Sequence, residues 1–133
     1  MKKRIGFFIM AILFFISGCS EKEVSIDYIL ALLDDHDIAY EEQEEIHPSN
    51  ELRETIDNHV FELEEGRLRV HFFATEEDRK EVQKDPYPAA VFVATSGYGK
   101  DNVLIYYVSG NDELTDKLDT VFEDWECAFG CEP

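Results

Sequence analysis

Apolar residues at helical spacing predict an amphipathic helix over residues 24–37. The apolar positions recur at i, i+3, i+4 and i+7, and they are Ile26, Ile29, Leu30 and Leu33. Ser25 can cap the N-terminus of this helix, because its hydroxyl can accept a hydrogen bond from an N–H group of the first turn. The run DDHD at residues 34–37 ends the pattern. We expect a weak edge strand to follow over residues 38–46.

Alternating apolar and charged residues predict a β-hairpin over residues 60–73 (VFELEEGRLRVHFF). With a two-residue loop at Glu65-Gly66, every facing pair matches in type, apolar with apolar and acid with base. These pairs are Glu64–Arg67, Leu63–Leu68, Glu62–Arg69 and Phe61–Val70. One face would lie on the core and the other would carry opposite charges. The preceding residues, 51–58, are ambiguous between helix and strand.

A second hairpin is predicted later in the chain, after a short exposed helix over residues 75–84 that starts with a capping box at Thr75. Two nearly continuous apolar runs, 89–95 (AAVFVAT) and 102–108 (NVLIYYV), would form its strands, joined by the loop SGYGKD at residues 96–101. Such runs are typical of central strands that are buried on both faces.

Asn111 is a predicted N-cap for a final helix, which Gly130 would end. Its apolar face comprises Leu114, Leu118, Val121, Phe122 and Trp125. The order of elements is then α-β-β-β-α-β-β-α. This order predicts an α+β domain, in which a small antiparallel-dominated sheet of two hairpins has helices packed against it.

The N-terminal 18 residues have the pattern of a cleaved export signal. Three basic residues at positions 2–4 precede fourteen uncharged residues, and charged residues follow directly after position 20. A spanning helix needs about 20 apolar residues, so the run is short for that role.

The end of this run, Ile16-Ser17-Gly18-Cys19, resembles the lipobox of bacterial lipoproteins. The resemblance implies that Cys19 is lipidated and becomes the first residue of the mature protein. An ordinary secretory signal with an incidental cysteine is the alternative. A diacylglyceryl group supplies the two acyl chains that stable anchoring requires. Residues 19–23 would form a short tether and hold a single domain, residues 24–133, within roughly 15–20 Å of the membrane.

The mature chain is strongly acidic. Removing residues 1–18 leaves 115 residues with nine basic and 30 acidic side chains, a net charge of −21. Nucleic acid is therefore an unsuitable partner, because binding to phosphates requires lysine and arginine. The acidity is interpreted as a solvated coat, and capture of a cation or a basic ligand is the functional alternative.

A wider resemblance covers about residues 60–125. The stretch RLRVHFFATEEDRKEV, followed by NVLIYYV and a helix, looks like small, functionally uncharacterised lipoproteins of Bacillus-like bacteria. The resemblance implies an extracytoplasmic protein, lipid-anchored to a Gram-positive plasma membrane. It brings no catalytic residues with it.

Cys127 and Cys131 are the remaining thiols once Cys19 is lipidated. In an exported protein they are candidates for a disulfide, with unpaired thiols and a metal or redox role as alternatives. The CxxxC spacing differs from the CxxC of thioredoxin-like sites. Glu126 and Glu132 flank the pair and disfavour a reactive thiolate.

The other polar motifs predict no cofactor, no metal and no catalytic set. The run DDHD places consecutive side chains in different directions around a helix end. None of the histidines has a second ligand at metal spacing, so all are predicted to lie at the surface; they are His36, His47, His59 and His71. The loop at residues 96–101 is expected to be a flexible hairpin tip, with Tyr98 exposed as a contact point.

These observations predict a membrane-anchored extracytoplasmic lipoprotein that acts as a non-catalytic binding or interaction module. Its partners would be the membrane, through Cys19, and an envelope protein. An envelope protein that captures a cation or a basic peptide is the alternative, and a small hydrolase is the third reading.

Overall fold

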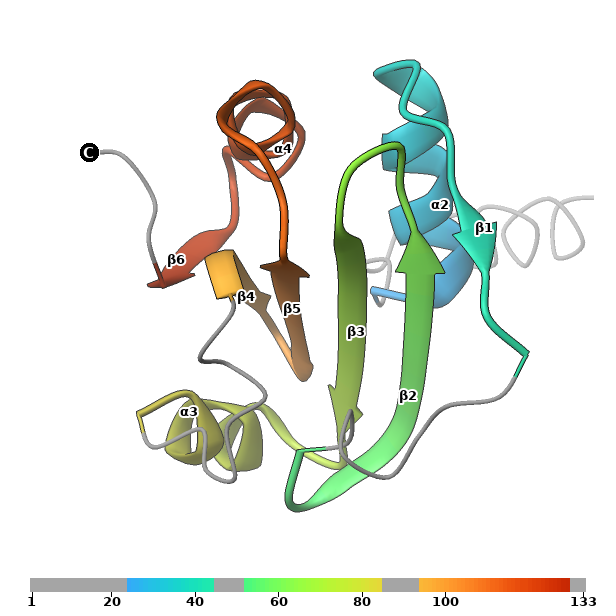
Figure 1. Cartoon of the computed structure of the whole chain (residues 1–133). Helices are drawn as coiled ribbons and strands as arrows, with labels where there is room; N and C mark the ends of the chain where they lie inside the picture. The colour runs from blue at the N-terminus through green and yellow to red at the C-terminus, as the bar shows by residue number, and fades with distance from the viewer. Residues whose placement is uncertain (1–23, 45–51, 85–93, 130–133) are drawn as a thin grey trace, which may run out of the picture.

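The computed structural model describes residues 24–44, 52–84 and 94–129 of the 133-residue chain. These residues form a six-stranded antiparallel sheet with three helices, so the predicted α+β fold is confirmed (Figure 1). The elements are α2 (Ile26–Asp35), β1 (Glu41–Glu42), β2 (Thr55–Glu62), β3 (Arg67–Phe73), α3 (Glu76–Lys84), β4 (Ala94–Lys100), β5 (Val103–Val108), α4 (Asp112–Val121) and β6 (Glu126–Phe129).

The sheet is covered on both faces. Its strand order is β1-β2-β3-β5-β4-β6, which places β3 and β5 at the centre. Apolar side chains of α2 and α4 pack on one face, and Val82 of α3 packs on the other. In Figure 1, α3 lies near the opposite end of the sheet from α2 and α4. No helix within the described ranges is long and apolar enough to cross a membrane.

Both predicted N-caps are confirmed. The Ser25 hydroxyl accepts from the Tyr28 N–H at 3.2 Å, and the Asn111 side chain accepts from the Leu114 N–H at 2.9 Å. The final helix ends at Val121 instead of extending toward Gly130, a residue outside the described ranges. Strand β6 follows it, which periodicity had not indicated.

The register of the first hairpin differs from the prediction by two residues. Glu62 faces Arg67 and Phe61 faces Leu68, because the loop comprises four residues, 63–66, instead of two. The Leu63 N–H donates to the Gly66 carbonyl at 3.1 Å, and Gly66 adopts a φ of 77°, which glycine tolerates best. A two-residue shift keeps each side chain on its predicted face but changes its partner.

The second hairpin turns later than predicted. Residues 96–100 belong to β4, and the turn comprises Asp101 and Asn102. The apolar run 89–93 lies outside the described residues. Tyr98, predicted to be exposed, is only 2% exposed, and its hydroxyl lies 2.5 Å from the Asp119 carboxylate on α4. Burial and this hydrogen bond both raise the pKa of Tyr98.

Arg79 fastens α3 to the sheet from a position that is only 1% exposed. Its Nε donates to the Asp101 carbonyl at 3.0 Å, and Nη1 lies 2.5 Å from Gln83 Oε1 and 3.3 Å from Glu126 Oε2. Gly99 makes room for it, since a Cβ there would lie 2.5 Å from Nη1. The short helix is therefore anchored on one side, where the sequence predicted an exposed helix.

Replacing Arg79 with methionine should destabilise the fold by about 3 kcal/mol, because it removes the buried guanidinium that bonds to all three acceptors. The matched control is Lys80→Met. Lys80 lies one residue away on α3 and forms an exposed ion pair with Glu76, so its loss should cost less than about 1 kcal/mol. Urea unfolding of both variants measures the difference, and equal costs would contradict the anchoring role.

Candidate functional site

The residues proposed from cysteine chemistry lie largely outside the described ranges. Cys19 and Cys131 are both outside them. Cys127 lies on β6, where it is exposed, and it is disulfide-bonded. The strand position of Cys127 replaces the helical one that the sequence suggested. The Cys127–Cys131 pairing stays a prediction, as does lipidation of Cys19.

The described residues contain no group of three or more histidine, cysteine or acidic side chains that could hold a metal ion. The DDHD run ends α2, and all four of its residues are exposed. His36 caps the helix, and its Nδ1 lies 2.9 Å from the Leu32 carbonyl. His47 lies outside the described ranges.

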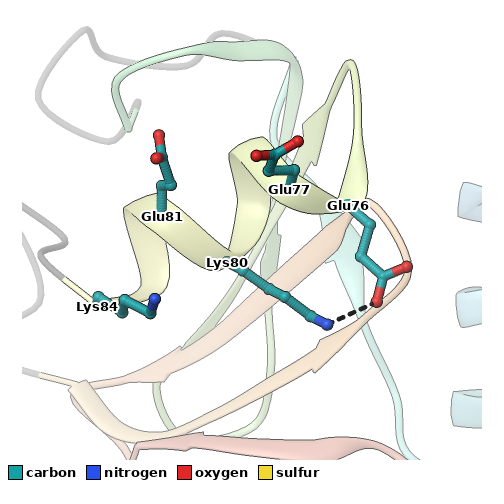
Figure 2. A pocket seen from close by; sticks show the side chains of 5 residues that line it. All are labelled: Glu76, Glu77, Lys80, Glu81 and Lys84. Atoms are coloured by element: carbon teal, nitrogen blue, oxygen red, sulfur yellow. Dashed lines mark ion pairs between the residues drawn. The ribbon is translucent and has the colours of Figure 1, made fainter.

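A hollow on the outer side of α3 is lined by charged residues that do not converge. Its lining comprises Glu76, Glu77, Lys80, Glu81 and Lys84. Figure 2 shows these side chains fanning out from the helix in different directions, with Lys80 paired to Glu76 at 3.1 Å. A bound molecule would meet one or two of these groups at a time, so this hollow has no defined chemistry.

A second hollow lies beside the acidic edge strand β1. Its lining comprises Glu41, Glu42, Gln43, Glu44 and Glu62. Two of these carboxylates already have partners, because Glu42 contacts His59 at 2.8 Å and Glu62 contacts Arg67 at 3.0 Å. The free acidic groups here are few, so this edge gives no specific support for cation capture.

His59 lies half-buried between two carboxylates. Its Nδ1 is 2.8 Å from Glu42 and its Nε2 is 2.9 Å from Asp57. Burial alone lowers the pKa of His59, but the hydrogen bonds to Glu42 and Asp57 outweigh that effect and raise it. The protonated ring therefore ties β1 to β2.

His71 is buried instead of exposed, which corrects the sequence prediction. It is 1% exposed on β3, on the same face as Phe73 and Val82. The prediction treated this face as charged and solvated. In the structure, the face becomes progressively covered along β3 and is fully buried at His71 and Phe73.

A chain of hydrogen bonds fixes the protonation of His71. The Thr55 hydroxyl donates its proton to the Leu52 carbonyl at 2.9 Å, so it must accept from the Asn58 amide at 2.9 Å. Asn58 then presents its carbonyl oxygen to His71 Nδ1 at 2.6 Å. We infer that Nδ1 carries the proton and that Nε2 is left as an acceptor.

Arg69 is the unusual residue of this face. It is 8% exposed, and its Nε is buried with no hydrogen-bond partner among the residues that the structure describes. Val60 and Tyr106 face it from the neighbouring strands, and neither offers a charge. Burial lowers the pKa of Arg69, and the nearby Arg67 lowers it further. A buried Nε–H without an acceptor is costly to a fold.

Tyr106 completes the group that we call the Arg69 cluster, which consists of Arg69, His71 and Tyr106. Tyr106 is paired with Arg69 across β5 and β3, and its ring meets the His71 ring edge-on at 6.2 Å. Burial raises the pKa of Tyr106 to about 12, so its hydroxyl stays protonated at neutral pH. Gly97 leaves space for this ring, since a Cβ there would lie 2.8 Å from it.

The Arg69 cluster thus offers a cation, a neutral donor and a neutral acceptor on one buried face. Sequence reasoning missed it because the two-residue loop placed Arg69 opposite Glu62. The available signal was the spacing of Arg67, Arg69 and His71, which puts three basic side chains on one face of a strand in an acidic chain.

His71 should make the protein lose stability in acid. Burial, followed by the charge of Arg69, lowers the pKa of His71 from 6.5 to about 3. Below pH 6.5 the unfolded chain therefore takes up a proton that the folded chain refuses, and stability falls by at most about 1.4 kcal/mol per pH unit. Relative to His71→Gln, the wild type should lose stability from pH 6.5 to pH 4 in urea unfolding.

His59→Gln provides the matched comparison, with the opposite sign. Because the pKa of His59 is raised, its stabilisation is complete below pH 6.5 and is lost as the pH rises above that value. The two variants should therefore diverge from the wild type on opposite sides of pH 6.5. Parallel pH profiles for all three proteins would contradict both assignments.

Comparisons with known proteins give no information on the role of the Arg69 cluster. No protein-family model matches the chain, and neither the curated proteins nor the solved structures contain a significant match. The resemblance to small lipoproteins therefore stays a prediction. The functional interpretation rests on the geometry of this face and on the N-terminal sequence.

Proposed function

We propose that this protein is an extracytoplasmic lipoprotein, anchored through Cys19 to a Gram-positive plasma membrane, that acts as a non-catalytic binding module. The observation that carries the binding role is the unpartnered Nε of Arg69 within a buried face. A protein retains a costly buried group when a function requires it, and a ligand that accepts from the guanidinium offsets the cost.

The protonation states in the Arg69 cluster favour binding over acid–base catalysis. A general base works best when its pKa lies near the working pH, whereas the pKa of His71 is held at about 3. The pKa of Tyr106, about 12, also lies far from neutral pH, on the alkaline side. Both groups keep one protonation state at neutral pH, which suits fixed hydrogen bonds to a ligand.

The start of the domain supports close attachment to the membrane. Val24 is 7% exposed and belongs to the core that α2 forms with the sheet. The distance from Cys19 to this packed residue is at most about 17 Å in an extended chain. A lipid on Cys19 would therefore hold the sheet near the bilayer surface, where envelope molecules are its nearest partners.

Cys19→Ala should move the full-length protein from the membrane fraction to the soluble or unprocessed fraction of a Gram-positive host. Cys131→Ser is the matched control and should stay in the membrane fraction, because it leaves the lipobox intact. Mass spectrometry of the wild type should show a lipid on Cys19. A Cys19→Ala protein that remains membrane-bound after processing would overturn the anchor.

The same variants test the disulfide. If Cys127 pairs with Cys131, a thiol-reactive probe should label Cys131→Ser at Cys127 and should leave Cys19→Ala unlabelled without reductant. Labelling of Cys19→Ala but not of Cys131→Ser would instead indicate a disulfide between Cys127 and Cys19. Such a disulfide would exclude lipidation, because Cys19 would have no free thiol.

The binding role is tested by thermal unfolding of the full-length protein in detergent micelles. A ligand that binds the folded state raises the midpoint, and the rise grows as the ligand concentration exceeds its dissociation constant. Fractions from solubilised envelopes of the native host should contain a component that raises the midpoint by several degrees. If no fraction shifts it, and pull-down from the same membranes yields no partner, the binding role is wrong.

A further inference from the structure

We propose that the Arg69 cluster binds a monoanionic carboxylate that carries an N–H or O–H donor next to it, as at the C-terminus of a peptide or in a hydroxy acid. This inference rests on the proposed binding function and names its ligand. Arg69 would receive the carboxylate, Tyr106 would donate to it, and His71 would accept from the adjacent donor.

The charge balance of the face favours one negative charge. Arg69 is the cation of the cluster, and the neighbouring Arg67 is already paired with Glu62 at 3.0 Å. A single buried guanidinium can neutralise a carboxylate, which its planar fork matches. A phosphate dianion would bring a second charge into a buried site with no described cation to balance it, at a large desolvation cost.

The acceptor on His71 adds the second requirement. Its Nδ1 is committed to Asn58, which leaves Nε2 as the acceptor of the ring. Nε2 stays unprotonated at neutral pH, because the pKa of His71 is about 3. A ligand donor beside the carboxylate would bond to Nε2, whereas a plain carboxylate would not. This difference predicts selectivity between the two kinds of ligand.

The position of Arg69 along β3 supplies a route to the surface. Arg67 lies two residues earlier on the same face, and its side chain is 48% exposed. Exposure falls at Arg69 and then at His71. A ligand would therefore enter from the Arg67 end, with its carboxylate leading to Arg69.

The test uses full-length ¹⁵N-labelled protein in detergent micelles, with four small probes. These are N-acetylglycine, acetate, N-acetylglycinamide and inorganic phosphate. After residue 19 the chain contains four arginines, so the Arg69 Nε–H signal can be assigned by its loss in Arg69→Met. N-acetylglycine should shift this signal and bind at least tenfold more tightly than acetate. The neutral amide and phosphate should not shift it.

Arg69→Met should abolish binding of N-acetylglycine and raise the thermal midpoint of the free protein, because it removes a buried Nε–H that has no acceptor. Arg67→Met is the matched control and should bind within threefold of the wild type. Arg69→Lys keeps the charge without the fork and should bind at least tenfold more weakly.

Three results would overturn the proposal: no shift of the Arg69 signal with any carboxylate, equal binding by Arg69→Met, or a lower midpoint for Arg69→Met. The last result would mean that the guanidinium is satisfied within the fold. If an envelope component still stabilises Arg69→Met as it does the wild type, the carboxylate site is wrong while the binding function stands. If no component stabilises either protein, both fail.

Discussion

The pairing of β3 with β5 at the centre of the sheet is the constraint on which the rest of this structure depends. Both strands are covered on their two faces, and every residue of β5 is buried. Side chains at alternate positions of β3 therefore have to enter one hydrophobic layer or the other. The 30 acidic residues cannot occupy these strands, so they lie on helices, loops and the outer strands where they are described. The charged surface and the polar residues in the sheet thus follow from the same central pair.

Local patterns predicted most of the elements but not the partners of their side chains. Periodicity placed the first helix within two residues at each end, and the caps at Ser25 and Asn111 are present. The loop at residues 63–66 was harder, because both loop lengths pair Glu62 with an arginine and Leu68 with an apolar residue, and the backbone at Gly66 fits the longer loop. Turn geometry is a property of three-dimensional strand twist. A composition of glycine, serine and lysine likewise reads as a loop at residues 96–100, although the glycines there admit neighbouring side chains.

The candidate site was missed for the same reason, because local patterns did not predict which residue faces Arg69. Arg69 next to a facing Glu62 is an ordinary surface pair, whereas Arg69 facing Val60 and Tyr106 is a buried charge. A shift of two residues makes this difference without moving any side chain to the other face. His71 was placed at the surface for a related reason: sequence alone does not show that a second layer, which includes α3, covers this face of the sheet. Tyr98 was placed there because residues 96–101 were read as a loop, whereas the strand continues and Tyr98 packs against Phe122 after α4.

Arg79 and Arg69 differ in whether the fold supplies hydrogen-bond acceptors for a buried arginine. Both are buried arginines in an acidic protein, but Arg79 has a carbonyl, an amide and a carboxylate around it. The Nε of Arg69 has no acceptor among the described residues. The acidic coat does not prevent an anion from binding here, because repulsion from exposed charges is screened beyond about 8 Å at physiological salt. An ion pair inside the sheet layer is screened far less. The acidic surface would repel polyanions more strongly than a small monoanion. A small monoanion at the membrane surface would therefore approach with little repulsion, and the guanidinium of Arg69 would hold it.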